Sequence, residues 1–292
     1  MAEPSLRVFS TLSFVEPISV EEMYGDWKVT ADQVQAELTR SLNPRSSDSL
    51  FDTVESLGMR SGATVLDVGA RDARHSVTLH QRLGCKVVAV DPVGHNVEAA
   101  LKLVDDMGYR SSIDVRLGTV EDIPADSGTF DLVFCRDVLS HVANVRVALE
   151  ECSRVTVPRG WMVTYQTFAT DLLEPLEKAR LCADLAVEPA SLDHGNFEAA
   201  VTHSPFVVES MELIGSEWRE FWEEDGTGRT SQQLLHAARL IRNGDEIRSR
   251  LGEIAYRVEL SNALWGIYQM IGKLEPRIYT LSKNSRFVPG RC

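Results

Sequence analysis

The sequence predicts an α/β fold in which a doubly wound, mostly parallel sheet of seven strands is covered by helices. Two observations support this prediction. Short apolar runs rich in β-branched residues recur along the chain, and helical segments separate several of them at the spacing of βαβ units. Strands buried on both faces are apolar at almost every position, as these runs are. With 292 residues, 43% of them hydrophobic, the chain can bury such a core.

The expected elements follow in chain order. Residues 1–50 are an N-terminal helical lid segment with a helix over 30–42, and the next helix begins after Ser47 or Asp48 and ends at Gly58. The predicted strands span residues 64–68, 86–90, 114–117, 130–134, 161–165, 206–213 and 277–281. The predicted helices between them span residues 74–83, 96–107, 145–155, 171–185 and 192–201. Residues 51–170 form the core, and 171–292 complete the sheet around a helical lid insertion at about 217–272.

Charge and cysteine usage exclude several classes of partner. The net charge is −13, from 43 acidic and 30 basic residues, so a nucleic-acid partner is not expected, because phosphate binding needs a basic surface. The five cysteines are scattered without metal-ligand spacing, which is typical of a reducing cytoplasm. Acidic residues interrupt the N-terminal apolar residues, so we expect neither a signal peptide nor a membrane partner.

A ligand site is predicted where the first strand meets its helix, at Val-Leu-Asp-Val-Gly-Ala-Arg-Asp-Ala-Arg over residues 65–74. Small residues at Gly69, Ala70 and Ala73 permit a tight turn and close approach of a ligand to the backbone. Asp91 ends the second strand, where a carboxylate can accept hydrogen bonds from both hydroxyls of a ribose. That spacing also suits a nicotinamide dinucleotide, but Asp67 and the lack of a GxGxxG motif disfavour one.

From these motifs, residues 50–170 resemble the class I S-adenosylmethionine (SAM)-dependent methyltransferases, which have a Rossmann-like fold. The resemblance implies SAM as the cofactor. The cofactor-binding residues that it implies are Asp67, Gly69, Ala70, Arg71, Asp91, Pro92, Val120, Glu121, Asp122 and Arg136. In the family, the segment matching 120–124 borders adenine, and the position of Arg136 contacts the methionine part. The helix and turn at 149–160 match those that lead into the fifth strand.

The chain departs from the family where glycines are usual. Arg71 and Ala73 replace two glycines of the first turn, and Arg159 replaces another before the fifth strand. The Arg71 side chain would either crowd the methionine carboxylate or bind it. The acidic residues also have structural explanations: Asp67 would orient the turn, and Asp91 would be a solvated loop residue. Glu121 and Asp122 would likewise be an exposed acidic pair.

His141 is the candidate catalytic residue, because it should lie near the open end of the fourth strand, where a base reaches an acceptor; packing is the alternative. Tyr165 and Gln166 end the fifth strand and are candidate substrate-binding residues, unless they are only a hydrated strand end. Trp222 belongs to an amphipathic aromatic helix that would either line the pocket or pack in the core. No metal ligands are expected.

The expected function is transfer of a methyl group from SAM to an oxygen, nitrogen or carbon atom of a small molecule, as in natural-product biosynthesis. This in-line displacement needs alignment and exclusion of water more than a strong base. One alternative is a SAM-binding protein of this fold that does not methylate, such as a cyclase or a binding module. A nicotinamide-dependent oxidoreductase is another. The helical lid could also serve as a homodimer surface.

Overall fold

A computed structural model describes residues 17–284, without the side chain of Asp26. The chain divides into two compact units, Met1–Asn43 and Pro44–Cys292. In the first unit, a π-helical turn, η1 (Glu22–Asp26), continues into α1 (Trp27–Thr39). The predicted helix over 30–42 therefore begins and ends three residues earlier than expected. No side chain of α1 is buried.

The second unit contains a seven-stranded sheet in the order β3-β2-β1-β4-β5-β7-β6. Its strands are β1 (Thr64–Val68), β2 (Lys86–Asp91), β3 (Ile113–Leu117), β4 (Phe130–Arg136), β5 (Thr156–Ala169), β6 (Phe206–Leu213) and β7 (Leu274–Lys283). Strands β1 to β5 pair in parallel, whereas β7 is antiparallel to both of its neighbours. The predicted seven-stranded, mostly parallel sheet is confirmed.

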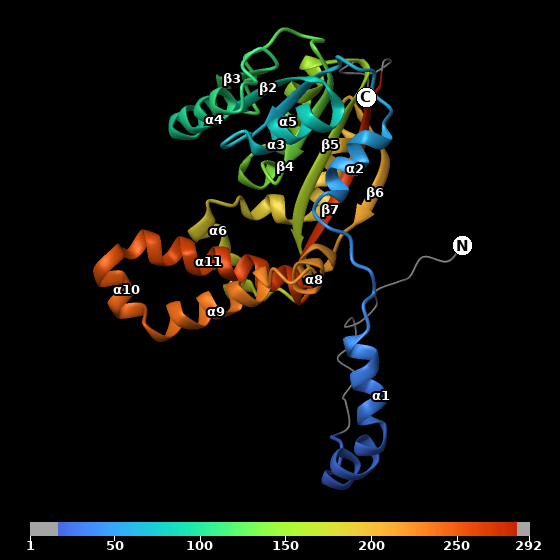
Figure 1. Cartoon of the computed structure of the whole chain (residues 1–292), viewed down its shortest axis with the longest axis vertical. Helices are drawn as coiled ribbons and strands as arrows, with labels where there is room; N and C mark the ends of the chain where they lie inside the picture. Colours follow the sequence, from blue (N-terminus) through green and yellow to red (C-terminus); the bar gives the residue numbers. More distant parts are fainter. Residues whose placement is uncertain (1–16, 285–292) are drawn as a thin grey trace. The chain divides into compact units, whose positions relative to one another are not determined.

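Helices cover both faces of this sheet, because its inner strands are apolar on both sides (Figure 1). One face packs on α2 (Ser49–Ser56), α3 (Arg74–Leu83) and α4 (Gly94–Asp106). The other packs on α5 (Val145–Val155) and α7 (His194–Thr202). Adjacent residues of one strand point to opposite faces, so Val65 belongs to the first core and Leu66 to the second. The fold is therefore doubly wound.

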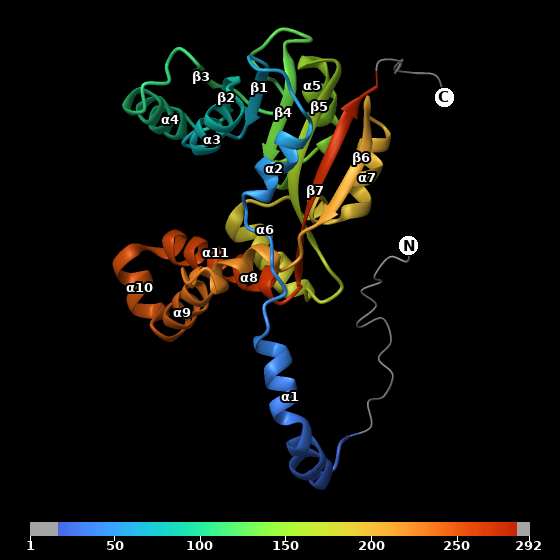
Figure 2. The same cartoon turned by 45° about the vertical axis from the view of Figure 1, so that its right-hand side comes forward.

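A group of helices lies at the end of the sheet where β5 ends (Figures 1 and 2). It contains α6 (Pro175–Leu185), α8 (Glu217–Glu224), α9 (Arg229–Arg242), α10 (Gly244–Leu251) and α11 (Glu253–Met270). Helices α8 to α11 form an insertion between β6 and β7, with a small core around Tyr256 and Leu260. Since parallel strands end here, these helices stand over the edge of the sheet where ligands bind in such folds.

Several elements differ from their predicted bounds, and for two of them the reason is identifiable. Strand β5 is much longer than 161–165, because its pairing with β7 continues to Ala169. Helix α6 begins at Pro175 rather than 171, where Pro175 occupies the first turn and Glu174 and Glu177 form a capping box. No helix within residues 17–284 is long and apolar enough to cross a membrane.

Candidate functional site

The turn after β1 fixes the end of that strand against β2. The amides of Gly69 and Ala70 both donate to the carbonyl of Val90, at 2.8 and 3.0 Å. Gly69 has a φ of +67°, and a Cβ atom there would lie 2.3 Å from Cγ2 of Val138. Only glycine fits such a position, because its backbone adopts positive φ freely and it has no side chain. Residue 69 therefore brings bare backbone to the carboxyl edge of the sheet.

The rest of this turn keeps a glycine-like shape without glycine. Arg71 and Ala73 have φ values of +51° and +61°, in the left-handed region. These are the positions where the resemblance leads us to expect glycines, and Arg159, the third such position, has a φ of +64°. The Arg71 side chain is exposed, and Ala73 precedes the first turn of α3. The turn that leads to the α3 amides is thus retained at a cost in backbone strain.

Asp91 lies at the end of β2 with its carboxylate held rigidly. Its Oδ2 accepts from the amide of Arg71 at 2.8 Å, and its Oδ1 accepts from the amide of Val93 and from Nδ2 of Asn96, both at 3.0 Å. The residue is only 6% exposed, so it is not a solvated loop residue. Because a carboxylate has about four acceptor positions and three are in use, about one remains for a ligand hydroxyl. These features fit the ribose of an adenosyl cofactor.

Asp67 lies in β1, where its side chain is buried and hydrogen-bonded within the protein. Its Oδ2 accepts a hydrogen bond from the Ser76 hydroxyl at 2.6 Å, which ties β1 to α3. Burial raises the pKa of Asp67 to about 7. The contact is that of a residue that orients the turn, one of the two explanations given by the sequence. Direct contact of Asp67 with a cofactor stays a prediction.

The segment predicted to border adenine follows β3. Val120 is buried, while Glu121 and Asp122 are exposed, as is Pro92 after β2. The Asp122 amide donates to Oγ1 of Thr119 at 3.1 Å, so a different amide of this segment would have to meet a ring nitrogen. The carboxylates of Glu121 and Asp122 could still accept from an exocyclic amine. Contact of these residues with the adenine stays a prediction.

Arg136 ends β4 between an imidazole and two stacked rings. Its Nη1 donates to Nε2 of His75 at 2.6 Å, and its Cζ lies 5.8 Å from the Tyr165 ring centroid and 5.5 Å from that of Trp218. Tyr165 and Trp218 stack with centroids 4.6 Å apart. Burial, followed by the Arg136 charge, lowers the pKa of His75 to about 4, so the imidazole is neutral at pH 7. In the described part of the chain, Arg136 has no carboxylate within 4.0 Å and can pair with an anionic group of a ligand.

His141 lies in a short 3₁₀ turn, η2 (Leu139–His141), after β4 and is exposed. Its Nδ1 is 2.9 Å from the carbonyl oxygen of Ala186. Because a carbonyl can only accept, Nδ1 carries the proton of the neutral ring and Nε2 keeps its lone pair. His141 thus has the tautomer that a general base needs, and packing does not explain an exposed ring.

The three residues predicted to bind substrate have different surroundings. Tyr165 is buried beneath Trp218, and its hydroxyl accepts from Nε2 of Gln269 at 3.3 Å. Gln166 is buried, with its Oε1 lacking a partner among residues 17–284. Adjacent side chains of a strand alternate between faces, so Gln166 points away from Tyr165. Trp222 is half-buried, with Arg219 at 4.8 Å and Arg229 at 5.2 Å over its ring.

Polar residues that are not among the predicted site residues join the sheet edge to the helical insertion. Gln269 of α11 reaches both Tyr165 and, at 3.3 Å, Oγ1 of Thr167. Asp137, after β4, has a φ of +59° and a buried Oδ1 with no partner in the described residues. Arg219 of α8 donates to Oε1 of Gln269. A signal existed for Asp137, an acidic residue directly after a strand, but none for Arg219, which lies in an amphipathic helix.

Comparison with known proteins places these features in a family. Residues 66–164 match the model of a family described as a methyltransferase domain. A ubiquinone biosynthesis O-methyltransferase of Azorhizobium caulinodans is 36% identical over 171 residues, which cover 54% of this chain and 66% of the relative. Two other enzymes of that name are matched over only 38% and 42% of their length, so the chain spans about two fifths of them.

Solved structures show the same fold at low sequence identity. A geranyl diphosphate methyltransferase in complex with SAM superposes with a TM-score of 0.61 at 17% identity, covering 81% of this chain and 85% of the other. The cyclase SpnF gives a TM-score of 0.62 at 17% identity, covering 84% of this chain and 85% of the other. Together with the turn at Gly69 and the carboxylate of Asp91, these matches show that residues 66–164 place the chain among the class I SAM-dependent methyltransferases.

Proposed function

We propose that this protein transfers the methyl group of SAM to a hydroxyl oxygen of a small-molecule acceptor. The observation that carries the proposal is the Asp91 carboxylate, which is 6% exposed and fixed by two backbone amides beside the bare backbone of Gly69. A buried carboxylate with an acceptor position still open at this edge of the sheet suits a hydroxyl of a ribose.

The remaining cofactor-binding residues have separate proposed roles. Arg136 and the first amides of α3 would hold the methionine carboxylate, with exposed Arg71 beside them. Ala70 and Asp67 would shape the turn, and Pro92, Val120, Glu121 and Asp122 would border the adenine. The bound cofactor supplies an electrophilic methyl group on a sulfonium ion. The protein then has to align the acceptor and exclude water.

His141 is the proposed general base. The Nε2 lone pair of its Nδ1-protonated ring would take the proton that the acceptor hydroxyl loses as its oxygen gains the methyl group. An oxygen acceptor is supported by the relatives, which are named O-methyltransferases. Tyr165 and Trp222 would contact the acceptor, and Gln166 stays a prediction, because its side chain points away from Tyr165.

The acceptor is proposed to be a small molecule covered by the helical insertion. The net charge of −13 disfavours a polyanion, and one structural neighbour is named for geranyl diphosphate, a small molecule. We also propose that the protein acts in cytoplasmic natural-product biosynthesis. Four buried free cysteines are consistent with a reducing compartment. A homodimer through the lid helices is a further proposal.

Calorimetry with S-adenosylhomocysteine tests the cofactor site. The wild type should bind it, and Asp91→Asn should bind at least about tenfold more weakly, because a hydrogen bond to a charged group contributes about 1.5–3 kcal/mol. Asp106→Asn, at the exposed end of α4, removes the same charge and should leave the affinity unchanged. No heat with well-folded wild type would overturn the proposal.

A SAM-binding protein that does not methylate is the second candidate. It is favoured by the non-glycine residues at Arg71 and Ala73, and a cyclase is among the structural neighbours. Mass spectrometry after incubation with SAM and 3,4-dihydroxybenzoate or its methyl ester separates the two. Formation of S-adenosylhomocysteine with a methylated product supports methyl transfer. Binding without turnover of any hydroxylated acceptor favours the second candidate.

A further inference from the structure

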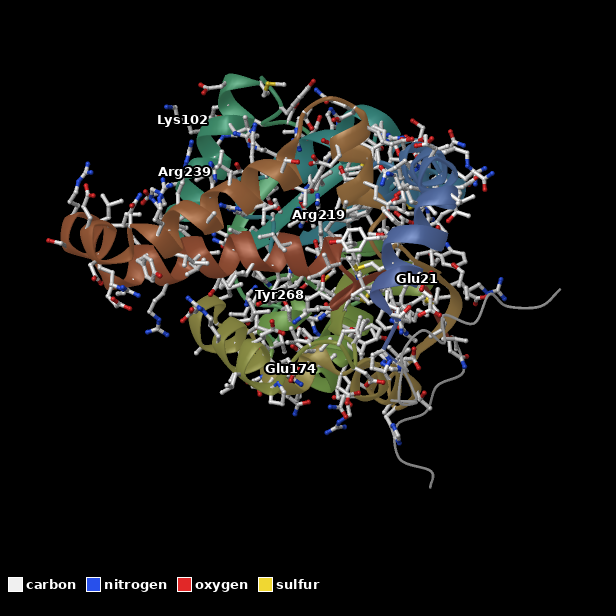
Figure 3. All side chains as sticks on the ribbon, turned by 90° about the horizontal axis from the view of Figure 1, so that it is seen from below. Glu21, Lys102, Glu174, Arg219, Arg239 and Tyr268 are labelled. Carbon is white, nitrogen blue, oxygen red and sulfur yellow. The ribbon has the colours of Figure 1, made fainter. Side chains whose placement is uncertain are left out.

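Arg219 of α8 is held in place by neutral groups of two other helices. Its Nε and Nη2 both donate to Oε1 of Gln269 on α11, the Nε at 2.8 Å, and its Nη1 donates to Oε1 of Gln233 on α9 at 3.1 Å. Its Cζ lies 4.8 Å from the Trp222 ring centroid. Figure 3, which views the molecule from below relative to Figure 1, shows Arg219 among the helices of the insertion. The guanidinium is thus oriented without any carboxylate contact.

The packing around Arg219 depends on a glycine. A Cβ atom at Gly266 of α11 would lie 1.9 Å from Oε1 of Gln233, the same oxygen that accepts from Arg219. Gly266 has helical geometry, so the missing side chain, and not an unusual backbone, provides the space. Arg219 therefore sits in a built site and not on a loose surface.

The charge of Arg219 is not balanced within the protein. Neither Arg219 nor Arg136 has a carboxylate within 4.0 Å among residues 17–284. Burial lowers the pKa of the Arg219 guanidinium, while Tyr165 and Asp137 raise it. Asp137 interacts electrostatically with both Arg219 and Arg136, so this carboxylate is shared between two guanidinium groups. A half-buried cation without an ion-pair partner is costly unless a ligand provides the anion.

We propose that Arg219 binds a carboxylate group of the methyl acceptor. The inference rests on the proposed methyl transfer and adds the substrate class. Arg136 and the α3 amides serve the cofactor, whereas Arg219 stands on the insertion that covers the acceptor side. Of the five N–H groups of the guanidinium, three donate to Gln269 and Gln233, so one on Nη1 and one on Nη2 remain as donors to a carboxylate. A dianionic phosphate fits less well, because Asp137 is nearby and only one guanidinium is free for the acceptor.

The surroundings of Arg219 favour an aromatic acid. Trp222 lies under its guanidinium, and the stacked pair of Tyr165 and Trp218 lies against Arg136. Aromatic rings pack well against such faces, and a half-buried indole keeps apolar area available to a ligand. An aromatic carboxylate would satisfy both the cation and the rings.

Calorimetry with matched probes tests the inference on full-length protein saturated with S-adenosylhomocysteine. Benzoate should bind at least tenfold more tightly than the neutral benzamide and more tightly than phenyl phosphate. Arg219→Gln should remove the preference for benzoate over benzamide and leave S-adenosylhomocysteine affinity unchanged. Arg229→Gln is the control, since exposed Arg229 lies over the same Trp222 ring and its loss changes the net charge equally. It should keep the preference.

The outcomes separate this inference from the proposed function. If the wild type does not bind S-adenosylhomocysteine, the proposed function is overturned. Normal cofactor binding with equal affinity for benzoate and benzamide, or with no benzoate binding, overturns the inference alone, as does a preference that survives Arg219→Gln. A preference for phenyl phosphate over benzoate overturns the carboxylate assignment. If Arg219→Gln does not fold, Arg219→Lys is used instead, because it keeps the charge but loses the paired donors. Benzoate binding that is at least threefold weaker than in the wild type supports the assignment. Unchanged benzoate binding contradicts it.

Discussion

The Val138 side chain occupies the space in which a side chain of residue 69 would lie. Its Cγ2 atom is 2.3 Å from the position of a Cβ atom at Gly69, and all three nearest atoms belong to Val138. The two residues follow β1 and β4, which pair side by side in the sheet. The turn of the cofactor site is therefore fixed by packing between neighbouring strand ends as well as by its own hydrogen bonds.

Replacing Gly69 should damage both stability and cofactor binding. Gly69→Ala should lower the free energy of unfolding by about 2 kcal/mol or more, from a left-handed backbone cost of about 1–2 kcal/mol and an overpacking cost of about 1–3 kcal/mol. Urea denaturation measures the change. Gly128→Ala is the matched control, because Gly128 has a similar φ of +65° and open space at its Cβ position. Gly128→Ala should therefore lower the free energy of unfolding only by the left-handed backbone cost of about 1–2 kcal/mol.

A substitution of Val138 isolates the contact between residues 69 and 138. Val138→Ala introduced together with Gly69→Ala should recover about 1 kcal/mol relative to the sum of the single effects, since contacting residues couple by about 0.5–3 kcal/mol. Strict additivity of the two substitutions would contradict the packing explanation.

His141→Ala should slow methyl transfer without weakening cofactor binding. A general base contributes about 10²–10⁴-fold to rate, so turnover of 3,4-dihydroxybenzoate with SAM should fall by about 100-fold or more. Calorimetry should give an unchanged affinity for S-adenosylhomocysteine. His203→Ala is the control, because exposed His203 also places Nδ1 near a backbone carbonyl, that of Ala199 at 2.7 Å, but at the end of α7. Equal turnover of wild type and His141→Ala would exclude His141 as a base.

Restoring a glycine at Arg159 should stabilise the protein. Arg159 is exposed and has a φ of +64°, so Arg159→Gly relieves strain at the cost of greater freedom in the unfolded chain. The net gain should be about 0.5 kcal/mol, measured as a raised midpoint of thermal unfolding. Arg180→Gly, at an exposed position in the middle of helix α6, should instead cost about 1 kcal/mol, because glycine weakens a helix interior. The same sign at both positions would contradict the assignment of strain to Arg159.

The sheet and the cofactor edge were predictable because their signals are local. Strand ends at Val68 and Asp91 follow from apolar runs of a few residues, and a carboxylate directly after a strand is visible in the sequence. The left-handed backbone at Arg71 and Ala73 was not predictable from residue type, since arginine and alanine rarely adopt it. Residue type gave no hint there, although the family pattern did.

The polar residues beyond that edge were not predictable from one sequence. Arg136 meets His75 across 61 residues, and Arg219 meets Gln269 across 50, so neither pair forms a pattern along the chain. The contact of His75 with Arg136 depends on the pairing of β1 with β4. Such contacts arise from tertiary structure and need the fold before they can be named.

The stability of the protein should depend on pH through His75. Its pKa is about 4 in the folded protein against an ordinary value of 6.5, because burial and Arg136 disfavour the charged ring. Between these pH values the unfolded chain binds the proton and the folded chain does not, so stability is lost as the pH falls. His75→Gln, which can still accept from Arg136, removes this term. Relative to wild type, the variant should gain stability from pH 6.5 down to 4, by at most about 1.4 kcal/mol per pH unit.

Asp67 should give the opposite dependence. Its folded pKa of about 7 exceeds the ordinary 3.8, so the folded chain keeps a proton that the unfolded chain has lost, and stability is lost as the pH rises between the two values. Asp67→Asn should therefore gain stability relative to wild type from about pH 4 up to 7. Because the two terms oppose each other between about pH 4 and 6.5, the wild type should show a flatter profile there than either variant. Urea denaturation across this range measures all three, and parallel profiles would show that neither group titrates as its surroundings require.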